Sequence, residues 1–229
     1  PTIANVETLS IGFGASTFLD MENVTGATSL VLDGAGGTAA QIKNLATAAT
    51  VTVTDEGTLA GTGDLSSLTI DTVADATLTV KVAADAAAAT AALTDLTTLT
   101  ITDAISLAIT NVGGSADNVL AHVITNLALD DDETTSLSIT TSAFGEFNST
   151  GAVTGTSVLE SVTVSAGASG DIALGTIADA EELETISVTA AGGDVTMGVI
   201  GTTPPTALSS IALTSTSAGT IATGAISAS

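Results

Sequence analysis

The chain has 229 residues, with 25 acidic residues, only two cationic ones and a formal net charge of −23. This balance disfavours nucleic acids and anionic membrane surfaces as partners, because almost no cationic side chain is available to neutralise their phosphates. Hydrophobic residues make up 45% of the chain and aromatic residues only 2%, so the core should consist of small aliphatic side chains. No apolar run approaches the roughly 18 residues of a transmembrane helix, and cysteine is absent, so disulfides cannot stabilise the fold.

The first half of the chain contains short strand-like segments separated by turns rich in Gly and Asp. The chain begins at Pro1 without Met or a recognisable leader, so we expect a fragment of a longer or processed protein. Two segments are ambiguous. Residues 83–92 are rich in Ala and fit a short helix or a loop, and residues 117–125 fit a helical turn or a strand. The predicted strands lie within residues 6–11, 23–32, 50–54, 61–70, 77–82, 96–101 and 105–109.

The last third of the chain repeats one pattern three times. The segments GDIALGTI, GDVTMGVI and GTIATGAI begin at Gly170, Gly193 and Gly219, and each follows a hexapeptide (LESVTV, LETISV or LSSIAL) that begins at Leu159, Leu183 or Leu208. One unit therefore spans about 24 to 25 residues, a period typical of stacked or solenoid architectures. A similar hexapeptide begins at Thr134, 25 residues before Leu159.

Alternation along each repeated segment predicts which side chains face the core, because successive residues of a strand point to opposite faces. Polar neighbours such as Ser161, Thr163, Ser187 and Ser210 should face water. Thr223 replaces an apolar residue in the last copy, so we expect a weaker coil or one near an end. The residues predicted to point inward are Leu159, Val162, Val164, Ile172, Leu174, Ile177, Leu183, Ile186, Val188, Val195, Met197, Ile200, Leu208, Ile211 and Leu213.

These observations predict an all-β fold, a parallel β-solenoid of about 24–25-residue repeats with at most short helical excursions. We divide it into a less regular half, residues 1–133, and a half of regular repeats, residues 134–229. Both belong to one continuous domain, because a solenoid lengthens without enlarging its core.

Calcium is the cofactor that the turns favour, because carboxylate and carbonyl oxygens at Gly-rich turns are the hard ligands that Ca²⁺ prefers. Asp at a turn also serves as an Asx-turn residue and for solubility, which is the simpler interpretation of any single position. The strongest cluster is Asp130 to Glu133. The complete set of candidate metal ligands is Asp130, Asp131, Asp132, Glu133, Asp33, Asp55, Asp64, Asp171 and Asp194.

The residue inventory argues against an enzyme. His122 is the only histidine, and Lys43 and Lys81 are isolated, so a packed or solvated role is the simpler interpretation of each. Paired carboxylates could serve glycoside chemistry, but Trp, Tyr and Arg, which usually accompany them, are absent. We therefore predict neither catalytic residues nor a bound organic cofactor.

Three segments resemble a known family. NVETLSI at residues 5–11, VLESVTV at 158–164 and ELETISV at 182–188 are similar to the L-E-T-[IL]-x-[IV] repeats of bacterial S-layer proteins and of RTX-type adhesins exported by type I secretion. The full calcium nonapeptide G-G-x-G-x-D-x-U-x of RTX proteins is missing, and only residues 33–38 (DGAGGT) and 61–65 (GTGDL) echo it.

This resemblance implies an extracellular, self-assembling structural protein whose lattice or fibre on a bacterial cell is stabilised by calcium. Its partners would be other copies of the chain and cell-surface polysaccharide. The alternative is an adhesin or phage-fibre-type stalk that binds a surface ligand. An ice-binding solenoid is disfavoured, because it needs repeated outward Thr-x-Thr ranks and TVTVT at residues 50–54 occurs once.

Overall fold

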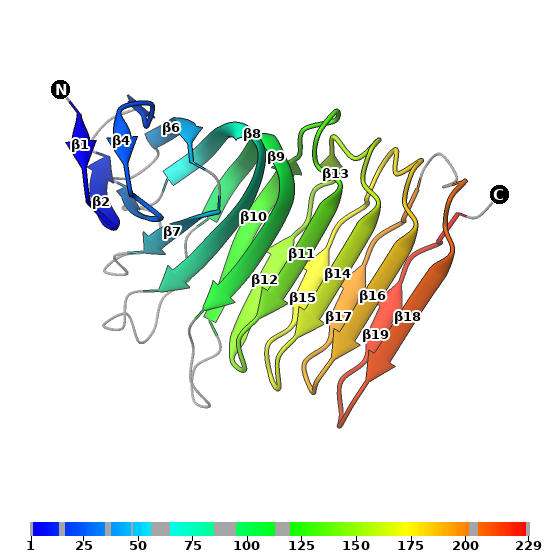
Figure 1. Ribbon diagram of the computed structural model, residues 1–229. Helices are drawn as coiled ribbons and strands as arrows, with labels where there is room; N and C mark the ends of the chain where they lie inside the picture. Colours follow the sequence, from blue (N-terminus) through cyan, green and yellow to red (C-terminus); the bar gives the residue numbers. More distant parts are fainter. Residues whose placement is uncertain are drawn as a thin grey trace.

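The computed structural model describes residues 2–13, 17–34, 38–46, 48–55, 65–84, 95–112, 120–201 and 206–227. Every regular element in these ranges is a β-strand, and no helix occurs in them. The long-range strand pairs are parallel, and most join equivalent residues of successive coils. Figure 1 shows the coils stacked side by side from the N-terminal to the C-terminal end of the chain. The predicted parallel β-solenoid is therefore confirmed.

Two ladders of parallel strands form the two broad sides of the solenoid. Sheet one runs through β2 (Thr8–Phe13), β5 (Ser29–Gly34), β7 (Ala49–Asp55), the second halves of β8 (Leu65–Ala84) and β9 (Asp95–Val112), β11 (Ser136–Thr141), β14 (Ser161–Ala166), β16 (Thr185–Ala190) and β18 (Ser210–Ser215).

Sheet two returns the chain on the opposite side of the core. It runs through β3 (Thr17–Asp20), β6 (Thr38–Leu45), the first halves of β8 and β9, β10 (Leu120–Ala128), β12 (Gly145–Ser149), β15 (Ile172–Leu174), β17 (Val195–Met197) and β19 (Ile221–Thr223). The short strand β13 (Val153–Thr154) pairs with the end of β10, and β1 (Ile3–Ala4) pairs with β4 (Val24–Thr25).

The length of a coil changes along the chain. Between equivalent residues of sheet one the step is 21 residues in the first two coils and 29 or 30 in the next three. It then settles at 25, 24 and 25 in the last three. The period seen in the sequence therefore holds from β11 onward, and the earlier coils keep the same register in space although they differ in length.

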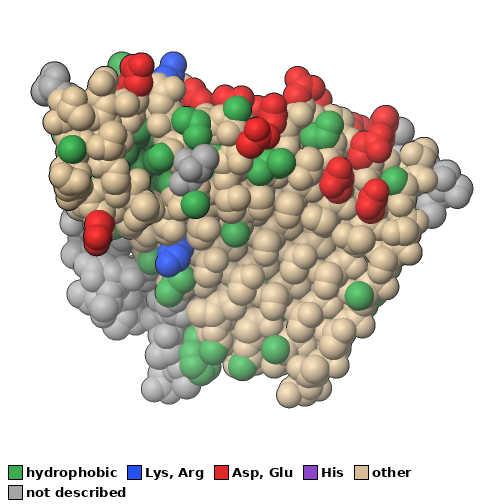
Figure 2. Space-filling model, viewed as in Figure 1, with side chains coloured by type: hydrophobic (Ala, Val, Ile, Leu, Met, Phe, Trp, Pro, Cys, Tyr) green, Lys and Arg blue, Asp and Glu red, His purple; other side chains and the backbone are tan. Residues whose placement is uncertain are grey.

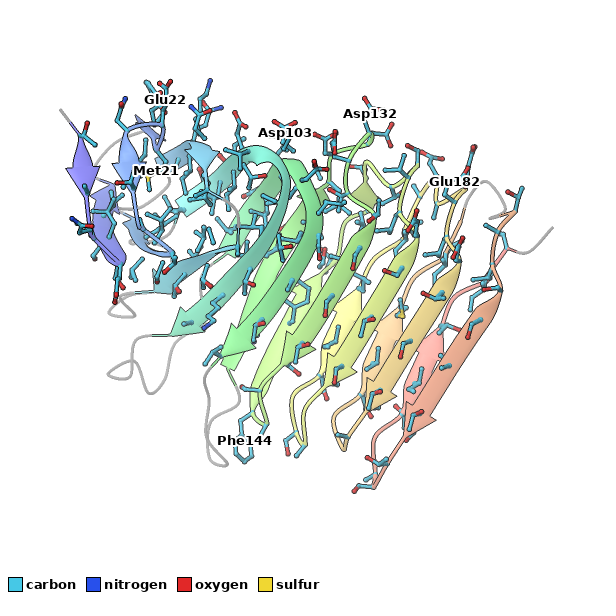
Figure 3. All side chains as sticks on the ribbon, in the orientation of Figure 1. Met21, Glu22, Asp103, Asp132, Phe144 and Glu182 are labelled. Carbon is cyan, nitrogen blue, oxygen red and sulfur yellow. The ribbon has the colours of Figure 1, made fainter. Side chains whose placement is uncertain are left out.

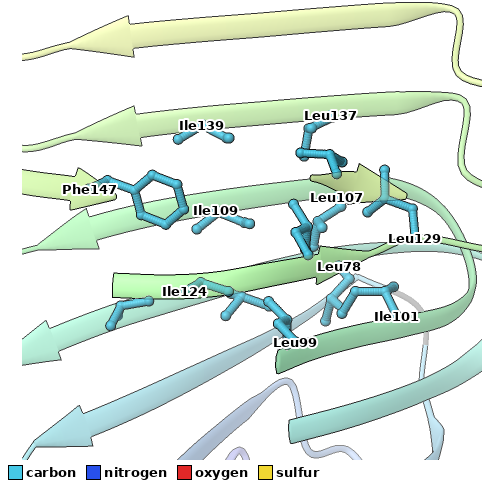
Figure 4. Close-up of a cluster of buried hydrophobic side chains, with 14 of the residues drawn as sticks. Leu78, Leu99, Ile101, Leu107, Ile109, Ile124, Leu129, Leu137, Ile139 and Phe147 are labelled. Atoms are coloured by element: carbon cyan, nitrogen blue, oxygen red, sulfur yellow. The ribbon is translucent and has the colours of Figure 1, made fainter. Parts of the chain in front are cut away.

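The core is built from columns of aliphatic side chains, one residue from each coil. One column on sheet one contains Leu30, Val51, Val80, Ile109, Ile139, Val164 and Val188, all at most 1% exposed. Figure 4 shows how such columns from both sheets meet in the middle of the stack around Leu107, Ile109 and Phe147. Because each coil covers the apolar face of its neighbour, no coil could bury this surface alone.

The alternation predicted for the repeats is confirmed in the coils that have a neighbour on both sides. Val162, Val164, Ile186 and Val188 are buried, and so are the corner residues Ile177 and Ile200 that follow Gly175 and Gly198. In the last coil, Ile211 and Leu213 continue the same columns but are 46% and 49% exposed, because no described coil packs on β18. Their predicted inward direction therefore holds, while their burial is lost at the end of the described stack.

The two ambiguous segments are settled only in part. Residues 120–125 belong to strand β10, so the strand alternative holds there, whereas residues 117–119 lie outside the described ranges. Ala83 and Ala84 end strand β8, and residues 85–92 of the Ala-rich segment are likewise outside them.

Stacked glycines allow the coils to approach closely where sheet one passes into sheet two. A Cβ atom built on Gly170 would collide with the carbonyl oxygen of Gly145, one on Gly193 with that of Gly170, and one on Gly219, at 2.6 Å, with that of Gly193. The glycine that begins each repeated octapeptide is therefore needed for the close contact between backbones.

We predict that Gly193→Ala destabilises the solenoid by about 1 to 3 kcal/mol, because neither the Gly170 carbonyl nor the new methyl group can move away without breaking the ladder. Gly12→Ala is the matched control, since nothing lies within 4 Å of a Cβ at that position. Urea denaturation followed by far-UV circular dichroism measures both variants. Equal midpoints for the two variants would contradict the close packing at Gly193.

Candidate functional site: an acidic ridge

Most acidic side chains gather on one edge of the solenoid. Fourteen of the eighteen whose side chains are described lie on segments that lead from sheet two back to sheet one. Figure 2 shows most of the visible acidic atoms along one edge, and in Figure 3 the labelled residues Glu22, Asp103, Asp132 and Glu182 lie along it. We call this set the acidic ridge: Asp20, Glu22, Asp71, Asp75, Asp103, Asp130, Asp131, Asp132, Glu133, Glu160, Asp179, Glu181, Glu182 and Glu184.

Backbone geometry explains part of the ridge. Asp75, Asp103 and Asp179 have φ angles of +60°, +61° and +48°, and Asn44 on the same edge has +55°. These values lie in the left-handed region, where Asp and Asn are the non-glycine residues best tolerated. Asp20 and Asp130 serve turns in another way, because each accepts the backbone N–H of the residue two positions later, Glu22 at 2.9 Å and Asp132 at 3.1 Å.

Asp71 and Asp103 form an interacting carboxyl pair on the ridge. Asp71 lies in the bend of β8, and Asp103 lies one coil further on in the bend of β9. The pKa of Asp71 is raised by partial burial of its carboxyl group, then by the charge of Asp103 and a hydrogen bond with it, while Lys43 acts in the opposite direction. At neutral pH the two negative charges therefore repel one another in the folded chain.

The acidic cluster at residues 130–133 uses two of its carboxylates to join coils. Asp130 Oδ2 accepts the backbone N–H of Asp103 at 3.0 Å, and its Oδ1 accepts the N–H of Asp132 at 3.1 Å. Asp131 Oδ1 accepts the N–H of Ser157 in the next coil at 3.1 Å, and hydrogen bonding from Ser157 lowers the pKa of Asp131. These two aspartates thus cap backbone groups of neighbouring coils.

Asp171 and Asp194 stand apart from the ridge, where sheet one passes into sheet two. The Asp194 N–H donates to Asp171 Oδ1 at 2.7 Å, and the Thr220 N–H donates to Asp194 Oδ1 at 2.7 Å. Hydrogen bonding from Thr220 lowers the pKa of Asp194. These two candidate ligands are therefore successive members of one ladder of carboxylate-to-amide hydrogen bonds.

The other predicted ligands are placed only partly. Asp132 is exposed and Glu133 half-buried on the ridge. Asp33 lies in β5 and Asp55 in β7, but their side chains are outside what the structure describes, as is that of His122 in β10. Asp64 falls in a range that is not described at all. Of the nine predicted ligands, the structure brings together residues 130–133 and, separately, Asp171 and Asp194.

The described carboxylates do not form a calcium cage. Within the described ranges, no group of three or more Asp, Glu or His side chains converges on one point. Asp130, Asp131, Asp171 and Asp194 are engaged with backbone amides. A Ca²⁺ ion takes six to eight oxygen ligands, so these side chains do not fit an enclosed calcium site within one chain.

The sequence did not reveal most members of the ridge. Asp20, Asp71, Asp75 and Asp103 are spaced irregularly, because the coils that carry them differ in length. A signal existed for Asp71 and Asp103, since these two residues follow the strand-like segments 61–70 and 96–101. Only the register of the coils shows that they occupy the same edge.

No family model, curated protein or solved structure matches this chain. Among the residues that the structure describes, no helix has the length and apolar character needed to cross a membrane.

We predict that Asp71→Asn stabilises the chain at neutral pH by less than about 1 kcal/mol, because it removes one charge of a partly exposed like-charge pair. Since the folded-state pKa of Asp71 is raised, the wild-type repulsion disappears as the pH falls through that pKa, and the stability gained by Asp71→Asn should vanish at acidic pH. High salt should reduce the same gain, because it screens the repulsion. Thermal unfolding at pH 7 and below pH 4 measures the effect. The control is Asp132→Asn on the same ridge; an equal gain there would refute a specific Asp71–Asp103 repulsion.

Proposed function

We propose that this chain is a structural segment of an extracellular protein that assembles with copies of itself into a surface layer on a bacterial cell, and that calcium promotes the assembly. The observation that carries the proposal is the acidic ridge. A rod whose charge is concentrated along one edge packs beside its neighbours only when that edge is neutralised or kept apart from theirs. The resemblance of the hexapeptides to S-layer and RTX-type repeats supports the same role.

The carboxylates of the ridge attract cations collectively. Adjacent coils are about 4.8 Å apart, so neighbouring carboxylates of the ridge lie within one Debye length, which is about 8 Å at physiological ionic strength. Their repulsions therefore add along the edge, and divalent cations accumulate there more strongly than monovalent ones. Because the described carboxylates build no cage, calcium acts in this proposal as a counterion that screens the whole edge.

The architecture also suits a structural role. The interior is filled with aliphatic columns that are at most a few per cent exposed, and each coil is joined to the next by parallel hydrogen bonding. Such a rod is stiff and modular, and its surface repeats with the coil period. A scaffold protein needs these properties, and the proposal assigns the chain no catalytic activity.

The test is sedimentation velocity and negative-stain imaging of the purified chain, first with millimolar calcium and then with chelator at constant ionic strength. We expect ordered sheets or filaments that dissolve on chelation, and little effect when calcium is replaced by sodium at equal ionic strength. A chain that stays the same soluble monomer in both conditions would contradict calcium-driven assembly and would favour the stalk of an adhesin.

Charge-removing variants separate screening of the ridge from other effects of calcium. Asp132→Asn combined with Glu182→Gln removes two exposed ridge charges, and we expect assembly at about half the calcium concentration or less, since less charge must be screened. The control Asp171→Asn combined with Asp194→Asn removes two charges away from the ridge and keeps their Oδ1 acceptors. A higher calcium requirement in the ridge variant would indicate direct ligation and refute screening.

A further inference from the structure

The outer face of sheet one is covered by hydroxyl side chains in straight columns. Three of its outward columns contain twenty-four residues, of which twenty are Ser or Thr, and every one of these is half-buried or exposed. The register of the ladder gives the columns as Thr77, Ser106, Ser136, Ser161, Thr185 and Ser210; Thr8, Ser29, Thr50, Thr79, Ala108, Ser138, Thr163, Ser187 and Ala212; and Ser10, Val31, Thr52, Lys81, Thr110, Thr140, Ser165, Thr189 and Thr214.

This hydroxyl face carries a single charged side chain, Lys81, in a chain of net charge −23. Figure 2 shows a broad uncharged surface beside the edge that carries the acidic atoms. A neutral face lets two such acidic rods touch without placing carboxylates directly against carboxylates, which matters because like charges in contact cost several kcal/mol.

The residues are small enough for two faces to meet closely. Ser, Thr and Ala project little from a sheet, and stacked sheets with small side chains of low charge form dry, well-packed contacts. Thr methyl groups supply apolar area, and the hydroxyl groups both donate and accept hydrogen bonds across the contact.

The area of the face matches that of a stable interface. Sheet one has nine strands, β2 to β18, spaced about 4.8 Å apart, and each strand contributes about six residues of about 3.3 Å, which gives a face of roughly 38 by 20 Å. Two such faces in contact bury about 1,500 Å² in total, which is the size of a standard specific protein interface.

We propose that the hydroxyl face binds the hydroxyl face of a second copy of this chain, and that this pair is the lateral unit of the assembly proposed above. The inference rests on that proposed function for its role in the layer. The pairing itself follows from the neutrality, the small side chains and the area of the face.

The charge distribution also selects one arrangement of the pair. Strands of sheet one begin at the acidic ridge, because the ridge segments lead into them. A twofold axis parallel to the long axis of the rods makes the facing strands antiparallel, so the two ridges lie at opposite margins of the interface. They are then about 20 Å apart, which is more than two Debye lengths at physiological salt. The other face-to-face twofold arrangement would place both ridges at one margin.

The experiment is sedimentation equilibrium of the full chain in chelator at physiological salt, over a range of protein concentrations. The wild type should show a monomer–dimer equilibrium without calcium. Thr163→Glu, in the middle column of the face, should weaken dimerisation at least tenfold. The matched control is Thr196→Glu, which places the same charge on an exposed outward position of sheet two.

Three outcomes are distinct. Dimers weakened by Thr163→Glu and not by Thr196→Glu support the hydroxyl face, whatever calcium does. A second outcome is a wild-type chain that is monomeric in chelator and still assembles in calcium, with or without Thr163→Glu. This outcome overturns the inference and leaves the proposed function intact. Equal weakening by both variants means that added charge alone is responsible and also overturns the inference. Circular dichroism of each variant establishes that it is folded, and Ser138→Glu in the same column repeats the test should Thr163→Glu not fold.

Discussion

The parallel hydrogen-bond ladder between successive coils is the constraint on which the whole structure depends. It fixes the spacing of coils at about 4.8 Å, and it places equivalent residues in straight columns, such as Leu107, Leu137, Val162 and Ile186 in the core. A column does not tolerate a mixture of apolar and charged members on the inside, so the sequence is forced into alternation. The Gly170, Gly193 and Gly219 series follows from the same spacing, because a side chain there would meet a backbone carbonyl oxygen of the neighbouring coil.

The same ladder turns a dispersed charge into a ridge. Acids that are 27 or 32 residues apart in the sequence become neighbours across coils, as the Asp103–Asp130 hydrogen bond and the Asp71–Asp103 pair show. The broad face of sheet one, by contrast, receives hydroxyl groups in almost every coil. Charge and neutrality are thus separated on a rod of small cross-section, and this separation underlies both the proposed calcium-dependent assembly and the proposed pairing through the hydroxyl face.

Carboxylates in this fold serve two different purposes. Asp130, Asp131, Asp171 and Asp194 accept backbone N–H groups of neighbouring coils and stabilise the turns. Exposed acids such as Asp132 and Glu182 contribute charge alone. The calcium ligands predicted from Gly- and Asp-rich turns mixed these two classes, since both look the same in the sequence. The hydroxyl columns were hidden in the same way. A repeated Thr-x-Thr motif would have revealed them, and residues 50–54 (TVTVT) carry it. In the register of the coils, however, Ser in one coil lies beside Thr in the next, so the column of hydroxyl groups has no fixed sequence motif.

The sequence by itself determined the fold class, the period of the last coils and the inward residues of the repeats, because two-residue alternation and a fixed period follow directly from strand geometry and stacking. It also determined the net charge and the lack of aromatic side chains. Only the tertiary structure decided which residues of unequal coils share an edge or a column. The coils differ by up to nine residues in length while their strands stay in register, so sequence spacing no longer reports position in space. The acidic ridge and the hydroxyl face exist only once the ladder has aligned those coils.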